Sequence, residues 1–243
     1  MSHETIENKN ADAVRRGERL ARGYLEPELV MREQGIEQTI VVFGGTRIPE
    51  TQEALRLGKT DYYGIAREFG AIVGSSGQGP QDCRLILMTG AGPGIMEAAN
   101  RGAADVGAKS IGLNIRLPQE QVPNPYVTRE LCFDFRYFAI RKLHFMQRAK
   151  ALVAFPGGYG TLDELFETLN LVQTKKINPL PVVLVGEKYW RHAINPEFVA
   201  ARGLIDPDDL KLFWYAETAE EIWASIRDWH RAAHTPLLCD IDV

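Results

Sequence analysis

The chain has 243 residues, of which 45% are hydrophobic and 25% are charged, and its formal net charge is −4. These values are typical of a globular protein whose core is large enough to be stable without disulfides or metal ions. The acidic balance argues against a general affinity for nucleic acid or anionic membranes, and the lack of a long apolar run argues against a secretory signal and a membrane span.

Residues 1–36 are polar and are predicted to form an N-terminal extension, with short helices on either side of Pro27. Residues 37–235 are predicted to form one domain of alternating strands and helices, followed by a C-terminal tail at 236–243. The predicted strands are Thr39–Phe43, Leu85–Thr89, Ser110–Ile115, Ala151–Phe155 and Val182–Val185. The predicted helices are Asp61–Phe69, Ile95–Val106, Phe135–Lys150, Leu162–Val172 and Glu220–Ala233.

This alternation predicts the fold class. Continuous apolar strands are buried on both faces, and strands that alternate with helices are parallel and joined by crossovers. The chain is therefore predicted to be an α/β protein with a Rossmann-like, doubly wound and mostly parallel sheet. Thr128–Phe133 is a candidate for an extra strand, and Leu212–Tyr215 is a candidate for a final edge strand.

Three predicted strands run directly into glycine-rich turns, at Gly44–Thr46, Gly90–Gly94 and Pro156–Thr161. Ligands of such sheets bind beyond the carboxyl ends of the strands. We therefore expect the three turns to meet at one edge of the sheet and to form the binding site there.

The segment Pro156–Glu164, with the sequence PGGYGTLDE, is the strongest candidate for ligand contact. Its glycines allow backbone amides to converge on an anion, and the N-terminus of the helix that Thr161 is predicted to open attracts a phosphate. The alternative is a capping box, in which Glu164 bonds back to the Thr161 amide. Because a cap needs neither Pro156 nor three glycines, the loop as a whole favours a ligand.

The second glycine turn departs from the dinucleotide fingerprint. Ile95 stands where the third glycine is required, and no ribose-binding acid follows the strand that ends at Ile115. We therefore do not expect NAD, and we predict no cofactor. A mononucleotide site is the functional interpretation of this turn, and a compact entry into the next helix is the structural one.

Arg141 and Lys142 lie on the helix predicted before the PGG segment, and His144 and Arg148 lie close to the face that Arg141 occupies. A basic face of this kind is most often solvated, and that interpretation stays open beside a functional one. His230 and His234 have the spacing of two metal ligands, but no third ligand is near them in the sequence, so we predict no metal site.

Cys83, Cys132 and Cys239 are far apart in the sequence and form no CxxC pair. We therefore expect neither a zinc site nor a disulfide framework. Free thiols suit a reducing compartment, and a cytoplasmic location is expected.

The pair Arg141–Lys142, Met146 after it, and the PGGYGTLDE segment together resemble the Lonely Guy family of cytokinin riboside monophosphate phosphoribohydrolases. Many members of that family were once labelled lysine decarboxylase-like. The resemblance runs from about Thr39 to Tyr189. It implies a hydrolase that splits the N-glycosidic bond of a cytokinin or purine nucleoside 5′-monophosphate, such as AMP, and a homodimer or larger homo-oligomer. The Phe133–Ile140 stretch and the N-terminal extension resemble a larger bacterial branch of the family.

The resemblance also assigns roles to individual residues. Arg141 and Glu164 would be the catalytic pair. The implied substrate-binding residues are Gly45, Thr46, Gly92, Gly94, Met96, Glu120, Lys142, Gly157, Gly158, Tyr159, Gly160 and Thr161.

A carboxylate beside a phosphate site suits this chemistry. When the base leaves, the ribose has oxocarbenium character, which a carboxylate can stabilise while it activates water. Arg141 would either hold Glu164 ionised or stabilise the departing base. The main alternative is a non-catalytic carrier of a nucleotide-like ligand such as the molybdenum cofactor, and a remoter one is a DNA-processing factor, which the acidic balance disfavours.

Overall fold

The structure is a computed structural model that describes residues 3–116 and 122–238. Glu120, one of the expected substrate-binding residues, and Cys239 lie outside the described residues. Among the helices of the described ranges, none combines the length and the apolar character that crossing a membrane requires.

Seven strands form one sheet. They are β1 (Gln38–Phe43), β2 (Leu85–Thr89), β3 (Ser110–Ile115), β4 (Cys132–Phe135), β5 (Ala149–Ala154), β6 (Val182–Val185) and β7 (Phe213–Ala216). Their order is β4-β3-β2-β1-β5-β6-β7, and every neighbouring pair is parallel. The order reverses between β1 and β5, which is the point where sheets of this class bind ligands.

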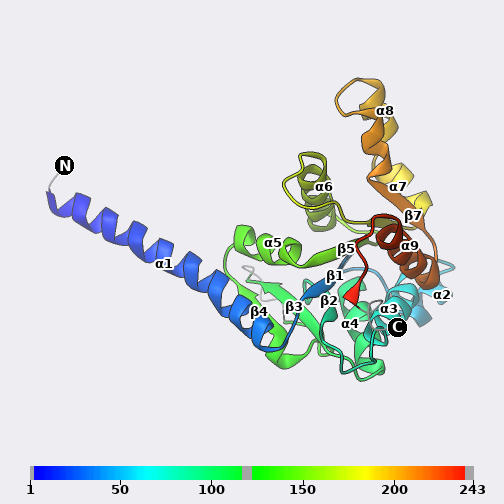
Figure 1. Cartoon of the computed structure of the whole chain (residues 1–243), viewed down its shortest axis with the longest axis horizontal. Coiled ribbons are helices and arrows are strands. Elements are labelled where there is room, and N and C mark those ends of the chain that lie inside the picture. The colour runs from blue at the N-terminus through cyan, green and yellow to red at the C-terminus, as the bar shows by residue number, and fades with distance from the viewer. Residues whose placement is uncertain (1–2, 117–121, 239–243) are drawn as a thin grey trace.

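Helices cover both faces of the sheet (Figure 1). The helices are α1 (His3–Glu33), α2 (Thr51–Arg56), α3 (Tyr62–Gly74), α4 (Ile95–Asp105), α5 (Phe138–Gln147), α6 (Tyr159–Gln173), α7 (Glu187–Ala193), α8 (Pro196–Ala201) and α9 (Ala219–Ala232), with 3-10 turns η1 (Arg129–Leu131) and η2 (Pro207–Lys211). One core joins the sheet to α3, α4 and α9, and a second core joins its other face to α1, α5, α6 and α7. The predicted α/β, Rossmann-like and doubly wound fold class is therefore confirmed.

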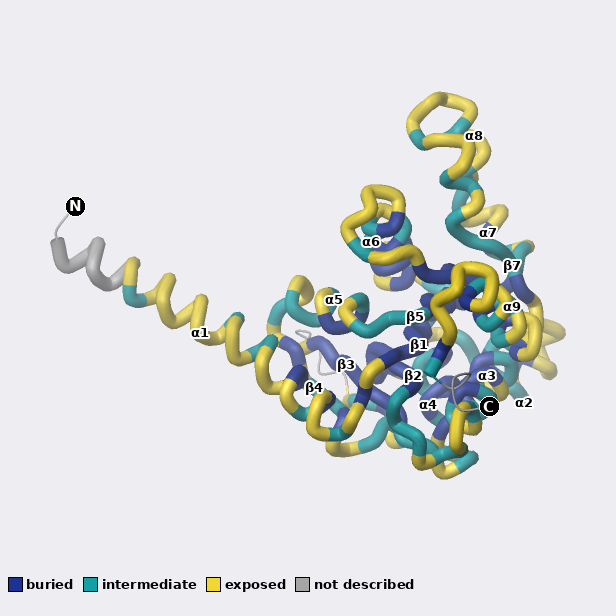
Figure 2. Tube along the Cα trace, in the orientation of Figure 1, coloured by how far each residue is buried: buried dark blue, intermediate teal, exposed yellow. Residues whose placement is uncertain are grey.

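The central strand shows why the apolar runs are continuous. Ile40 and Val42 of β1 belong to the first core, whereas Val41 and Phe43 belong to the second. Successive side chains of a strand point to opposite faces, so a strand buried on both sides has to be apolar at every position. Figure 2 shows this dark, buried centre of the sheet.

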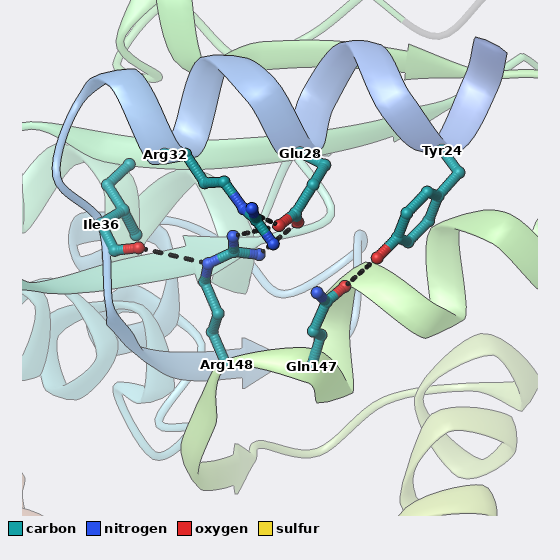
Figure 3. A network of polar contacts seen from close by, with 6 residues as sticks. All are labelled: Tyr24, Glu28, Arg32, Ile36, Gln147 and Arg148. Atoms are coloured by element: carbon teal, nitrogen blue, oxygen red, sulfur yellow. Dashed lines mark hydrogen bonds and ion pairs between the residues drawn. The ribbon is translucent and has the colours of Figure 1, made fainter. Parts of the chain in front are cut away.

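The helix α1 differs from the sequence prediction. It runs unbroken through Pro27, so the prediction of two short helices around that proline is wrong. Its last part packs on the body, where the Arg148 side chain reaches both oxygens of Glu28 and the carbonyl of Ile36 (Figure 3). Its first part extends away from the rest of the chain (Figure 1), and residues 10–22 are largely exposed (Figure 2).

Other predicted boundaries shift for local reasons. The predicted helix Phe135–Lys150 is shorter, because Phe135 pairs with Ile115 in the sheet and Ala149 already begins β5. The predicted strand Thr128–Phe133 is partly wrong, since its first half forms η1 and β4 begins at Cys132. The predicted edge strand Leu212–Tyr215 is confirmed as β7 with a shift of one residue. The domain limits at residues 37 and 235 stay predictions.

Candidate active site

The three glycine turns lie together beyond the carboxyl ends of β1, β2 and β5. The Gly45 amide, after β1, donates to the carbonyl of Pro156, after β5, at 2.9 Å. The Gly45 carbonyl in turn accepts from the amide of Ile95, the first residue of α4, at 3.2 Å. The first turn therefore links the other two at the reversal point of the sheet.

Close packing explains why two of the glycines, Gly94 and Gly157, are needed. Gly94 has a φ of +68°, and a Cβ there would overlap the Gly45 carbonyl and the backbone of Thr46. A Cβ on Gly157 would overlap the Thr161 hydroxyl and lie 2.9 Å from the Gly45 amide nitrogen. These glycines thus let the turns touch each other, which brings backbone amides of different turns close together.

Gly158 and Gly160 differ from these packed glycines. A Cβ on either of them would meet no atom within 4 Å, so the space beside them is open. Gly158 is the N-cap of α6, and Tyr159, the first helical residue, is 92% exposed. The first amides of a helix have no intrahelical partner and carry its positive dipole end, so this open corner can hold an anion.

The geometry of α6 contradicts the capping-box alternative. The helix begins at Tyr159, so the prediction that Thr161 opens it is wrong. The Thr161 amide donates to the Gly158 carbonyl at 3.0 Å, and the cap residue makes no side-chain cap hydrogen bond. Glu164 is therefore free of a capping role at the start of its own helix.

Arg141 on α5 and Glu164 on α6 face each other across the two helices. Arg141 Nη2 lies 3.5 Å from Glu164 Oε1, and their side chains are 12% and 4% exposed. The guanidinium also lies over the rings of Phe138 and Phe145, with its central carbon 5.1 and 5.5 Å from the ring centroids. Arg141 is thus buried against aromatic rings, which contradicts the solvated-face interpretation for this residue.

Burial changes the acidity of Glu164. It raises the pKa of this carboxyl from 4.5 to about 7, against the opposing pull of Lys142 and Arg141. Glu164 Oε1 and Arg141 Nε also have no hydrogen-bond partner within the described residues. A carboxyl group that titrates near neutrality and has an open acceptor is suited to exchange a proton with water or substrate.

Lys142, the neighbour of Arg141, lies among acidic side chains of α6. Its Nζ is 2.5 Å from Glu167 Oε2, 2.9 Å from Asp163 Oδ2 and 3.8 Å from Glu164 Oε2. Burial alone would lower the pKa of Lys142, but the hydrogen bonds that its ammonium donates to Glu167 and Asp163 hold it above its ordinary value. The ammonium is therefore charged and is already engaged with carboxylates.

The second glycine turn is held from behind by a buried polar network that the sequence analysis missed. Asn124 donates from its side-chain amide to the Gly92 carbonyl at 3.1 Å and to Asn100 Oδ1 at 3.0 Å. The hydroxyl of Thr89 donates to Asn100 Oδ1 and accepts from the Ala91 amide. The sequence signal that could have pointed to this network is Asn100, a polar residue among the alanines and glycine that form the buried face of α4.

Ala91 occupies a backbone position with a φ of +60°. A Cβ built on Gly112 would lie 2.9 Å from the Ala91 Cβ, so this alanine packs against the next strand. On the open side of the turn, the Met96 sulfur and Arg141 Nη1 lie 3.0 and 3.9 Å from where a Gly90 Cβ would be. Met96, Arg141 and the glycine turn are thus neighbours.

Three further polar side chains make structural contacts near the site or behind it. The Tyr189 hydroxyl donates to the Gly157 carbonyl at 2.5 Å and so fixes the PGG turn, a contact with no local sequence signal. His144 stacks on Tyr24 with ring centroids 5.0 Å apart. His230 lies 2.7 Å from the Lys150 carbonyl and is a helix-to-strand link. No group of three or more His, Cys, Asp or Glu side chains in the described part of the chain is arranged to hold a metal ion.

The chain matches a known protein family. Residues 96–226 match the family described as possible lysine decarboxylase. This range covers more than half of the chain and contains Arg141, Lys142, the PGG turn and Glu164.

Two of the curated relatives have the names of nucleotide hydrolases. A cytokinin riboside 5′-monophosphate phosphoribohydrolase of Arabidopsis thaliana is 27% identical over 165 residues, which cover 65% of this chain and 74% of the relative. A pyrimidine/purine nucleotide 5′-monophosphate nucleosidase of Escherichia coli is 33% identical over 130 residues, which cover 47% of this chain but 28% of the relative.

Solved structures show the same fold. The molybdenum cofactor binding protein of Rippkaea orientalis aligns with a TM-score of 0.54 at 21% identity, over 79% of this chain and 97% of that one. The Moco carrier protein of Chlamydomonas reinhardtii aligns with a TM-score of 0.54 at 21% identity, over 81% of this chain and 99% of that one. At this identity the likeness concerns the fold alone.

Proposed function

The chain belongs to the Lonely Guy family, whose members are also described as possible lysine decarboxylases, and from this premise we propose that it is a nucleoside 5′-monophosphate phosphoribohydrolase. It would split the N-glycosidic bond of a purine or cytokinin nucleotide into free base and ribose 5-phosphate. The observation that carries the proposal is the buried pair of Arg141 and Glu164 beside the open N-terminus of α6.

The 5′-phosphate would occupy the corner formed by Gly158, Tyr159, Gly160 and Thr161. Amides and the helix dipole favour a dianion there, and the open space beside Gly158 and Gly160 leaves room for it. Gly45 and Thr46 of the first turn, Gly92 and Gly94 of the second, and Gly157 would shape the cradle, with Met96 lining its wall. Binding of the remote phosphate supplies energy that positions the sugar at the reacting centre.

Glu164 lies about one helical turn beyond that corner and is assigned as the general base. Its carboxylate would take a proton from water as the water oxygen bonds to C1′ of the ribose. The electron pair of the C1′–N bond leaves with the base, which takes up a proton, so the products are the free base and ribose 5-phosphate. Arg141 would favour the ionised form of Glu164 against the effect of burial, because a positive charge beside a buried carboxylate stabilises its charged form.

The same residues argue against a decarboxylase based on a lysine Schiff base. Such a lysine reacts as a neutral amine, which requires a lowered pKa. Lys142 instead lies among three carboxylates, which hold its pKa up. A carrier of a nucleotide-like ligand would likewise gain little from a carboxyl group beside its phosphate site.

The proposal includes an assembly and a location. Phe138, Leu143 and Phe166 on α5 and α6 are about half exposed, and we expect a homodimer or larger homo-oligomer to cover them. Cys83 and Cys132 are free thiols, which suit a cytoplasmic enzyme. Light scattering of the full chain measures the assembly.

The experiment that tests the function is incubation of the full chain with AMP, followed by chromatography for adenine and ribose 5-phosphate. A panel of nucleoside 5′-monophosphates against the matching nucleosides identifies the preferred base. We expect turnover of AMP and at least about a hundredfold less turnover of adenosine, since the phosphate supplies the positioning energy. Equal turnover of AMP and adenosine would contradict the assigned phosphate corner, and tight binding without release of any base would indicate a carrier.

A further inference from the structure

Lys142 has no role in the chemistry described above, although it is adjacent to Arg141 and 16% exposed. Its ammonium has three N–H donors, and three carboxylates surround it at 2.5, 2.9 and 3.8 Å. All three carboxylates come from two successive turns of α6, Asp163 and Glu164 from one and Glu167 from the next. Lys142 of α5 therefore links α5 to α6, the helix that carries the proposed general base Glu164.

We propose that Lys142 is a positioning residue, which holds the Glu164 carboxylate in place and in its charged form through the α5–α6 contact, rather than a ligand of the nucleotide. This inference rests on the proposed function, in which Glu164 takes a proton from water. It replaces the implied role of Lys142 in fixing the substrate.

The surroundings of Lys142 disfavour contact with a phosphate. Glu167 and Asp163 lie closest to the ammonium, and each is a carboxylate that would repel a phosphate dianion. The lysine also borders a groove of about 1240 Å³ whose walls include Leu143, Met146 and Glu167. The glycine corner at Gly158 is not part of that groove.

Four charged groups face Glu164, and they act in opposite directions. Arg141 and Lys142 from α5 favour its carboxylate, whereas Asp163 and Glu167 on its own helix disfavour it. With Glu164 itself ionised, the cluster holds two positive and three negative charges. Removing the charge of Lys142 therefore pushes Glu164 toward its protonated form, and removing the charge of Glu167 pushes it toward the carboxylate. A lysine that acts only through packing predicts no upward shift in the pKa of Glu164 when its charge is removed.

The test compares full-length Lys142→Met, Lys142→Arg and Glu167→Gln with the wild type, using AMP from pH 5 to 9. We expect Lys142→Met to move the acidic limb of kcat/KM upward by about one pH unit and to lower kcat at pH 7 by up to about tenfold, with KM within about twofold. Glu167→Gln is expected to move the same limb downward, and Lys142→Arg to retain the wild-type profile. If instead KM rises about tenfold in Lys142→Met while the limb stays in place, Lys142 is a substrate ligand and the inference is wrong.

A second measurement separates this inference from the proposed function. The side-chain carboxyl carbons of ¹³C-labelled glutamate are titrated by NMR, and the Glu164 signal is identified by its loss in Glu164→Gln. We expect its midpoint to rise in Lys142→Met and to fall in Glu167→Gln, whether or not the protein releases a base from AMP. If the wild type hydrolyses no nucleotide while these midpoints move as stated, the proposed function is wrong and the effect of Lys142 on Glu164 stands. Midpoints that do not move overturn the inference, and Lys142→Gln, which also removes the charge but keeps a polar end, takes the place of Lys142→Met if that variant does not fold.

Discussion

Arg141 and Glu164 form an ion pair that is not closed by a hydrogen bond. Arg141 Nη2 and Glu164 Oε1 are 3.5 Å apart, and Glu164 Oε1 lacks a hydrogen-bond partner within the described residues. A buried acceptor without a partner destabilises the fold by about 1–3 kcal/mol. A pair held in this state keeps capacity for a water molecule or a substrate group, which distinguishes it from a structural salt bridge.

Replacing Glu164 by Gln removes the proton acceptor and keeps the shape of the side chain. We expect kcat for AMP to fall by about 10²–10⁴-fold, because this is the usual worth of a general base. Binding of AMP, measured by calorimetry, should persist, since the phosphate corner lies at the other end of the first turn of α6. The control is Glu197→Gln on α8, whose side chain is 59% exposed. Full activity in Glu164→Gln would remove Glu164 from the mechanism.

The raised pKa of Glu164 makes a prediction about stability. Because the folded protein holds this proton up to about pH 7 and the unfolded chain releases it near 4.5, the group's contribution to stability is complete at low pH and is lost as the pH rises through this window. The difference corresponds to at most about 3 kcal/mol. Relative to Glu164→Gln, the wild type should therefore lose stability between pH 5 and 8 in urea unfolding. Parallel pH dependences of the two proteins would show that burial does not perturb Glu164.

The glycines of the PGG turn should separate into two classes. Gly157→Ala places a methyl group against the Thr161 hydroxyl and the Gly45 amide, and we expect a loss of about 1–3 kcal/mol in the free energy of unfolding. Gly160→Ala meets no atom within 4 Å and replaces a poor helix former in α6, so stability should be unchanged or higher by up to about 1 kcal/mol.

The functional effect of Gly160→Ala is expected to be the opposite of its effect on stability. A methyl group in the open corner would keep the phosphate away from the amides, and KM for AMP should rise about tenfold, or about 1.4 kcal/mol in binding. Unfolding curves and kinetics of the two variants test both statements. A wild-type KM in Gly160→Ala would place the phosphate elsewhere.

The buried network behind the second turn should be sensitive to Asn124. Asn124→Ala leaves the Gly92 carbonyl and Asn100 Oδ1 each without one donor, at a cost of about 1–3 kcal/mol in the free energy of unfolding. We also expect kcat/KM for AMP to fall, because the turn beside Arg141 loses its anchor. Asn170→Ala, at an exposed position of α6, is the control and should change stability by less than about 0.5 kcal/mol. Equal stability of the two variants would show that the network does not hold the turn.

The sheet could be predicted from the sequence because its signals are local. Each strand that is buried on both faces reads as a continuous apolar run, and β2, β3 and β6 lie at the predicted residues. The meeting of the three glycine turns also follows from parallel topology, since such strands end at one edge. Two local predictions are wrong because tertiary contacts override the local signal. α1 continues through Pro27, and Phe135 pairs with Ile115 in the sheet instead of starting a helix.

The contacts between elements could not be predicted from the sequence. The spacing of Thr161 and Glu164 matches a capping box in the sequence. The structure shows that α6 already begins at Tyr159, so Thr161 is not the cap residue. The carboxylates around Lys142 lie about 20 residues away in the chain, and Asn124 is 24 residues from Asn100. Such pairings depend on how helices pack against the sheet, which no periodicity within one element reports.

Two arginines pair with Glu28 of α1, and they make different predictions about how α1 is attached to the rest of the protein. Glu28 accepts from Arg148, whose side chain is 9% exposed, and from Arg32, which is 70% exposed. The hydrogen bond from Arg148, opposed by burial and helped by Arg32, holds the pKa of Glu28 below its usual value.

Arg148→Ala leaves Glu28 buried without its inner partner, and we expect a loss of about 3–5 kcal/mol in the free energy of unfolding, together with faster hydrogen exchange along α1. Arg32→Ala removes a solvated partner and should cost less than about 1 kcal/mol. Because the pKa of Glu28 is lowered in the folded protein, the stabilisation by this group is complete at neutral pH and is lost as the pH falls through its folded pKa. The excess loss in Arg148→Ala should therefore shrink in acid. Losses of equal size in the two variants would show that α1 is held by its apolar contacts, such as buried Met31, rather than by the ion pair.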